Sequence, residues 1–140
     1  MKNILFTLLL TISFFTYGQK KELKQAQKLI DQEFYNEALD VLQNNKELIL
    51  SSDIKYQAHY YYLNGWALKE DSKSLKAVES LRKSIELERS IRQKKYIEDA
   101  NILIQNAEAE LVNSAVEDNK NDKFLEASEK LYDAYLMNPD

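Results

Sequence analysis

A short pattern of large, acidic and small residues recurs along this chain. It runs Tyr-x-Glu-Ala-Leu from Tyr35, shortens to Ala-Val-x-x-Leu from Ala77, and returns as Phe-x-Glu-Ala from Phe124. A helical unit of this kind has an apolar face that it cannot bury alone, so its copies must stack on one another. The pattern therefore predicts an all-α solenoid of antiparallel helix hairpins. Such folds usually serve as binding surfaces.

The composition favours long helices with short connections. The 140-residue chain contains only two glycines and one proline, and β-hairpin folds need more turn-forming residues than this. No segment alternates apolar and polar residues for long enough to indicate a strand. After a leader, we expect six helices, at about 20–32, 35–48, 53–70, 75–89, 93–119 and 123–136.

The first eighteen residues have the layout of a cleavable secretory signal peptide. Lys2 gives a positive start, a twelve-residue, mainly apolar run spans 4–15, and Thr16 and Gly18 place small residues before Gln19. Because the apolar run is short for a membrane span, we expect cleavage just after Gly18; an uncleaved anchor is the alternative. The sequence thus predicts a bacterial protein exported to the periplasm or cell envelope, with no membrane span after cleavage.

The charge and residue content exclude several functional classes. Removing Lys2 leaves 18 basic against 23 acidic residues, a net charge of about −5, which argues against a nucleic-acid partner. There is no cysteine, and the single histidine, His59, has no metal-ligand partner at a recognised spacing. Carboxylate pairs such as Glu86/Glu88 diverge on a helix, so solvated faces explain them better than a metal site. We therefore predict no enzyme activity, no cofactor and no metal.

The helical residues resemble the tetratricopeptide repeats, a family in which about 34 residues form two antiparallel helices. A small residue on each helix lets the backbones approach, and a bulky neighbour fills the flanking groove. The residues that carry the resemblance are Ala26, Leu29, Tyr35, Glu37, Ala38 and Leu42; Tyr61, Gly65, Leu68, Ala77, Leu81 and Ser84; and Leu111, Ala115, Phe124, Glu126, Ala127, Leu131, Ala134 and Pro139. The resemblance implies a repeat domain over 19–140 with units at about 19–52, 58–91 and 108–140. A generic helical bundle is the alternative.

The spacing of the units is irregular. Ala38 and Ala77 are 39 residues apart, and Ala77 and Ala127 are 50 apart. The larger excess falls in an extra helical segment, 92–107, which would lengthen the fifth helix by about 24 Å. Its apolar stripe must be covered, either by the fourth helix or by a second copy of the chain. Because the array stops at Asp140 without a polar capping helix, we expect the protein to continue beyond it.

One side of the third predicted helix carries the candidate partner contacts. His59, Tyr62, Trp66 and Lys69 fall within an arc of about 80° at 100° per residue, and the family resemblance places this side in the concave groove. Tyrosine and tryptophan suit binding because they combine apolar area with a hydrogen-bonding tip. The alternative is that Tyr62 and Trp66 pack against neighbouring helices.

Together these features predict a non-catalytic scaffold that binds a protein or peptide in the bacterial cell envelope. The alternative function is a structural or assembly module, acting through self-association as a homo-oligomer or as the N-terminal part of a larger envelope protein. No motif identifies the partner.

Overall fold

The computed structural model describes residues 18–137, and every regular element among them is a helix. A helical segment at 18–31 comes first. It is followed by α2 (Tyr35–Asn44), α3 (Lys46–Leu50), α4 (Ile54–Glu70), α5 (Ser74–Ser90), α6 (Ile97–Lys120) and α7 (Phe124–Met137). No strand occurs between residues 18 and 137, so the predicted all-α class is confirmed. The predicted signal peptide, apart from its last residue, and Pro139 lie outside the described residues.

Two of the predicted helices differ from the structure by more than two residues. The helix expected at 35–48 is divided into α2 and α3 at Asn45, which has φ −110° and ψ 10°. The side-chain amide of Asn45 donates a hydrogen bond of 2.8 Å from its Nδ2 atom to the Val41 carbonyl. Such a local bond competes with regular helical bonding. The helix expected to begin at 93 begins instead at Ile97, because Arg92 takes a positive φ of 55° and ends the preceding segment in a turn.

Four helices end in the same kind of turn, although no turn contains glycine. One residue in each has a φ between 55° and 63°, and these residues are Glu33, Ser72, Arg92 and Asp122. The next residue donates its N–H to a carbonyl five positions earlier, as from Lys73 to Leu68 at 2.9 Å. This geometry satisfies carbonyls that a helix end leaves unpaired. Glu33, Ser72 and Asp122 are spaced by 39 and 50 residues. The alanines of the repeated sequence pattern, Ala38, Ala77 and Ala127, have the same spacing.

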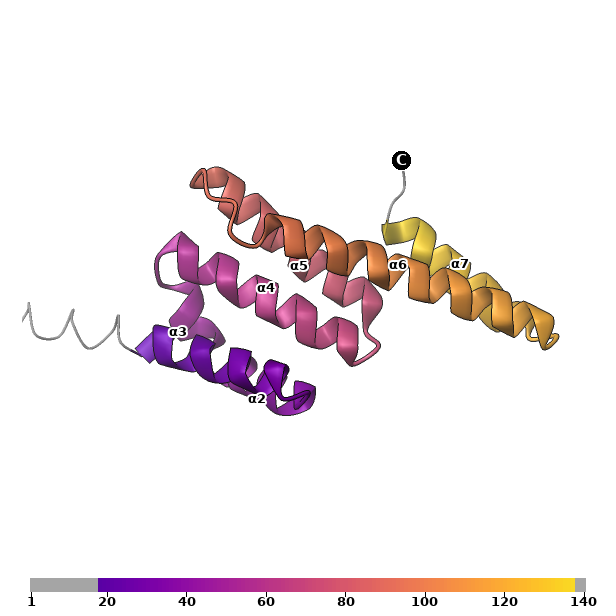
Figure 1. The fold of residues 1–140 in the computed structure, drawn as a ribbon, viewed down its shortest axis with the longest axis horizontal. Coiled ribbons are helices and arrows are strands. Elements are labelled where there is room, and N and C mark those ends of the chain that lie inside the picture. Colours follow the sequence, from indigo (N-terminus) through magenta and orange to yellow (C-terminus); the bar gives the residue numbers. More distant parts are fainter. Residues whose placement is uncertain (1–17, 138–140) are drawn as a thin grey trace, which may run out of the picture.

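The helices are arranged as consecutive antiparallel hairpins: 18–31 with α2, α4 with α5, and α6 with α7 (Figure 1). Gly65 shows why the middle hairpin is close-packed. A Cβ atom on Gly65 would lie 2.6 Å from Leu81 Cγ and 3.0 Å from the Ala77 carbonyl oxygen. The sequence pattern therefore places its small residue where α4 and α5 are too close for a larger one.

The buried residues form two separate clusters of unequal size. The larger one joins 18–31, α2, α3, α4, α5 and the start of α6, and its fully buried side chains include Leu23, Leu42, Ile49, Leu63 and Leu81. The smaller one consists of Val78, Ala107 and Met137. Beyond this point α6 and α7 extend away from the rest of the molecule as a two-helix arm (Figure 1).

The apolar stripe of segment 92–107 is covered from within the chain. Ala100 and Ala107 are completely buried, and Tyr96, Ile97 and Leu103 pack against the larger cluster. Of the two predicted ways to cover this stripe, the structure therefore shows the intramolecular one.

Candidate functional site

Two of the four predicted partner contacts are largely engaged in packing. The Tyr62 side chain is only 6% exposed, and its ring lies 5.9 Å from the Trp66 ring. Trp66 is partly buried and packs against the larger cluster. This arrangement favours the packing alternative for Tyr62 and leaves Trp66 at the edge of the core.

Lys69 is held by an ion pair between helices. Its Nζ atom lies 2.6 Å from Glu110 Oε1 on α6 and 3.4 Å from Glu70 Oε1. The Lys69 side chain is only 10% exposed. In this position Lys69 ties α4 to α6, one turn beyond Trp66.

Tyr96, which the sequence places on the apolar stripe of the fifth helix, is the centre of an aromatic stack. Its ring lies 4.8 Å from the His59 ring and 4.7 Å from the Tyr62 ring, with interplanar angles of 12° and 17°. Stacking of this kind adds to the stabilisation that comes from burial alone. Tyr96 therefore joins two of the predicted contacts across the boundary between α4 and α6.

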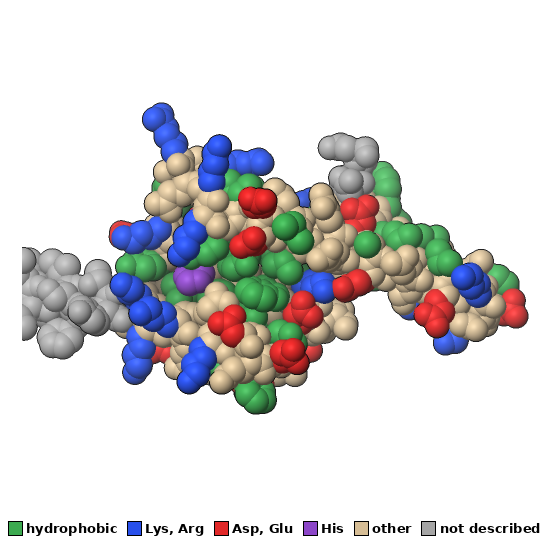
Figure 2. Space-filling model, viewed as in Figure 1, with side chains coloured by type: hydrophobic (Ala, Val, Ile, Leu, Met, Phe, Trp, Pro, Cys, Tyr) green, Lys and Arg blue, Asp and Glu red, His purple; other side chains and the backbone are tan. Residues whose placement is uncertain are grey.

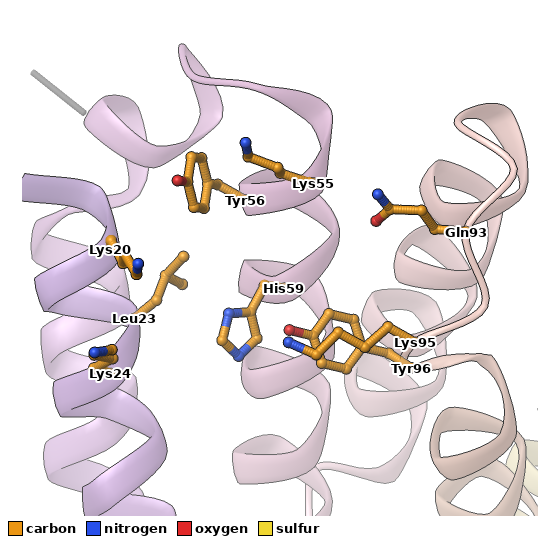
Figure 3. A pocket seen from close by; sticks show the side chains of 9 residues that line it. All are labelled: Lys20, Leu23, Lys24, Lys55, Tyr56, His59, Gln93, Lys95 and Tyr96. Carbon is orange, nitrogen blue, oxygen red and sulfur yellow. The ribbon is translucent and has the colours of Figure 1, made fainter. Parts of the chain in front are cut away.

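A pocket of about 270 Å³ opens beside this stack. Figure 3 shows that its lining comes from three separate parts of the chain: the 18–31 helix, the first turns of α4, and the loop that leads into α6. Its lining residues are Lys20, Leu23, Lys24, Lys55, Tyr56, His59, Gln93, Lys95 and Tyr96. We call this site the lysine groove. His59 is the only one of the four predicted contacts that lines it.

The lysine groove combines an apolar floor with a basic rim. Leu23 is buried and Tyr56, His59 and Tyr96 are half-buried, whereas Lys20, Lys24, Lys55 and Lys95 are exposed. Figure 2 shows lysine and arginine side chains gathered around the histidine at this end of the molecule, with acidic side chains towards the middle. One carboxylate reaches the rim, since Asp53 Oδ2 lies 3.3 Å from Lys55 Nζ. The groove is thus positively charged on a protein whose net charge is −4.

His59 adds no charge to the groove at neutral pH. Burial, with a smaller contribution from the nearby Lys95 ammonium, lowers the pKa of His59 to about 4. The imidazole is therefore neutral at pH 7 and acts as an aromatic surface beside Tyr96. The positive charge of the site comes from the four lysines.

The sequence did not predict the four lysines as one site because they come from distant segments. Lys20 and Lys24 precede Lys95 by more than 70 residues. Two features of the sequence could have pointed to a basic surface: the helical spacing of Lys20, Lys24 and Lys28, and the basic residues at 92–95. Only the stacking of three hairpins brings these segments to one groove.

Within the described range, no three His, Asp or Glu side chains are grouped closely enough to hold a metal ion. Among the same residues, no helix combines the length and apolar character that a bilayer-spanning segment needs. Comparisons with protein-family models, curated proteins and solved structures find no match to this chain. The resemblance to the tetratricopeptide repeats therefore rests on the residues quoted above and stays a prediction.

Proposed function

We propose that this protein is a non-catalytic scaffold of the tetratricopeptide type, which binds an acidic segment of another polypeptide in the lysine groove. The observation that carries the proposal is the convergence of four lysines, from three parts of the chain, around an apolar floor. The recurrence of the same turn at 39- and 50-residue spacing supports the repeat architecture.

The charge of the groove indicates the chemistry of the ligand. Each lysine ammonium attracts a carboxylate, and several together raise the association rate of an acidic partner and select against a basic one. Because these side chains are exposed, the attraction should weaken as salt shortens the Debye length from about 10 Å at 0.1 M to about 3 Å at 1 M.

The groove is small. Its volume is about 270 Å³, near the lower end of the about 300–1,000 Å³ usual for ligand sites. That volume suits one large side chain of a peptide whose neighbouring carboxylates meet the rim. Tyr56 and Tyr96 give the groove an aromatic wall, over which the Lys55 and Lys95 ammonium groups lie.

Fluorescence anisotropy with the labelled peptide Glu-Glu-Phe-Glu-Glu tests this function. We expect saturable binding that weakens in 0.5 M salt and falls about tenfold or more in the double variant Lys24→Glu/Lys95→Glu. The matched control is Lys76→Glu, which reverses an exposed lysine at the start of α5, outside the groove. Equal affinity for the same peptide with Gln in place of Glu would refute the proposal.

The bacterial envelope is the proposed location of the scaffold, and the predicted leader supports it. Expression of the full-length gene in a bacterium, followed by fractionation and mass measurement, tests this part. We expect the protein in the exported fraction with its N-terminus near Gln19.

A further inference from the structure

The arm formed by α6 and α7 exposes an unusual amount of apolar surface. The buried side of α7 consists of small residues and one methionine: Ala127, Ala134 and Met137. Its larger apolar side chains face solvent instead. The exposed large apolar residues of the arm between 112 and 136 are Val112, Val116, Phe124, Leu125, Leu131, Tyr132, Tyr135 and Leu136. A patch of this extent usually marks an interaction surface.

The tip of the arm has the most prominent apolar residues, and acidic groups surround them. Phe124 and Leu125, in the first turn of α7, are 62% and 71% exposed. Residues 117–130 contain five carboxylates and three lysines, a net charge of −2. Asp118 is occupied by an ion pair with Lys130, whereas Glu117, Asp122, Glu126 and Glu129 are exposed. The tip therefore presents large apolar side chains between carboxylates.

This tip is the chemical complement of the lysine groove. The groove offers an apolar floor to a large side chain and four ammonium groups to the carboxylates beside it. The two surfaces lie at opposite ends of the molecule, since the α6–α7 turn is the end farthest from residue 18 (Figure 1). A molecule therefore cannot fill its own groove.

We infer that the lysine groove of one molecule receives the α6–α7 tip of a second copy, with Phe124 or Leu125 on the floor and Asp122 and Glu126 among the lysines. This inference rests on the proposed function, because it names a second copy of the chain as the acidic partner. Charge favours this pairing over a contact between two tips, each of which carries −2 between 117 and 130. The contact is head-to-tail, so each added molecule leaves one groove and one tip free, and the chain can grow into a ring or filament.

Two variants of the full-length protein, purified from the exported fraction of a bacterial host, test this arrangement by sedimentation velocity. The groove variant is Lys24→Glu/Lys95→Glu, and the tip variant is Phe124→Ser/Leu125→Ser. All four positions are exposed, so both variants should keep the fold, which circular dichroism verifies. Tyr132→Ser is the matched control, because it removes an exposed apolar side chain of α7 two turns from the tip.

We expect the unmodified protein to form concentration-dependent oligomers that dissociate in 0.5 M salt, and Tyr132→Ser to keep them. Each of the other variants alone should associate at least tenfold more weakly. An equimolar mixture of the two should form a heterodimer and nothing larger, because one intact groove and one intact tip remain.

A groove variant that still self-associates would overturn the inference in favour of a tip-to-tip contact. An unmodified protein that stays monomeric would also overturn it. Peptide binding is then measured on the tip variant, whose groove is intact. If that variant binds the acidic peptide, the proposed function stands and only the second copy is rejected as the partner; if it does not, both are rejected.

Discussion

The carboxylate of Glu88, near the end of α5, accepts a hydrogen bond of 2.7 Å from the backbone N–H of Tyr96, at the start of α6. Glu88 is 1% exposed, so this bond lies under the loop that joins the two helices. It fixes the residue that stacks on both His59 and Tyr62, and thereby sets one wall of the lysine groove.

Replacement of Glu88 should show how much this bond stabilises the fold. In Glu88→Ala the backbone N–H of Tyr96 loses its acceptor in a partly buried position, and we expect the free energy of unfolding to fall by about 1–3 kcal/mol. Glu88→Gln keeps an oxygen in the same place and should cost less. Urea unfolding of the three proteins measures the difference. Equal losses for both variants would show that the negative charge, and not the hydrogen bond, matters.

Gly65→Ala should destabilise the protein although alanine favours helix formation. The added Cβ would lie 2.6 Å from Leu81 Cγ, and overpacking of this kind typically costs about 1–3 kcal/mol. The gain in helix propensity, about 1 kcal/mol, offsets only part of that cost. Thermal unfolding monitored by circular dichroism measures the net effect.

A double-mutant cycle with Leu81 tests the cause of this loss. Leu81→Ala alone should cost about 2–5 kcal/mol, because the side chain is completely buried. In the Leu81→Ala background, Gly65→Ala should cost clearly less than in the unmodified protein. If the two effects simply add, contact with Leu81 is not the reason for glycine at this position.

Acidification should destabilise the protein through His59. Its pKa is about 4 in the folded state against 6.5 ordinarily, so the unfolded chain binds more protons between these values. The contribution of neutral His59 to the free energy of unfolding is fully present above pH 6.5. It is lost as the pH falls towards 4, and the loss is about 3 kcal/mol at most. His59→Gln should remove this component, and the difference between the two proteins at pH 7 and pH 4.5 measures it. An NMR titration of the imidazole with a midpoint near 6.5 would contradict this prediction.

The ion pair between Lys69 and Glu110 should contribute little to stability. Although the atoms are 2.6 Å apart, the Glu110 side chain is 57% exposed, and such pairs typically contribute less than about 1 kcal/mol. We expect Glu110→Gln to lower the unfolding free energy by no more than that, and 0.5 M salt to reduce the difference further. Equilibrium unfolding at two salt concentrations measures both effects. A loss of several kcal/mol would show that Lys69 depends on this partner for its charge in the packed interface.

Helical periodicity predicts the elements of this fold well because each helix forms from local spacing. The exceptions have local causes that the periodicity does not register. Asn45 bonds to the Val41 carbonyl and divides one predicted helix, and Arg92 takes a positive φ that delays the start of α6. Both residues are polar at positions where a helix would carry polar side chains. The interruption of the helix is therefore visible only in their backbone conformation.

The candidate site was less predictable. Helical spacing shows which side chains share one side of a helix, but it does not show which other helix packs against that side. The predicted contacts His59, Tyr62, Trp66 and Lys69 all lie on α4, yet Tyr96 stacks on Tyr62 and Glu110 holds Lys69. The lysines of the groove lie on segments whose contact depends on how the hairpins stack. That stacking depends on long-range packing, which the sequence pattern does not describe.

The division of the buried residues into two clusters also bears on motion. The start of α6 packs on the larger cluster, but beyond Ala107 the α6–α7 arm contacts the body through the smaller cluster of three buried residues, and regions with few buried apolar contacts open first in native-state hydrogen exchange. The arm should therefore exchange its amide protons well before α4 and α5 do. The arm, for which we propose a contact with a second copy of the chain, is then also the part that can change its angle while the rest of the molecule keeps its shape.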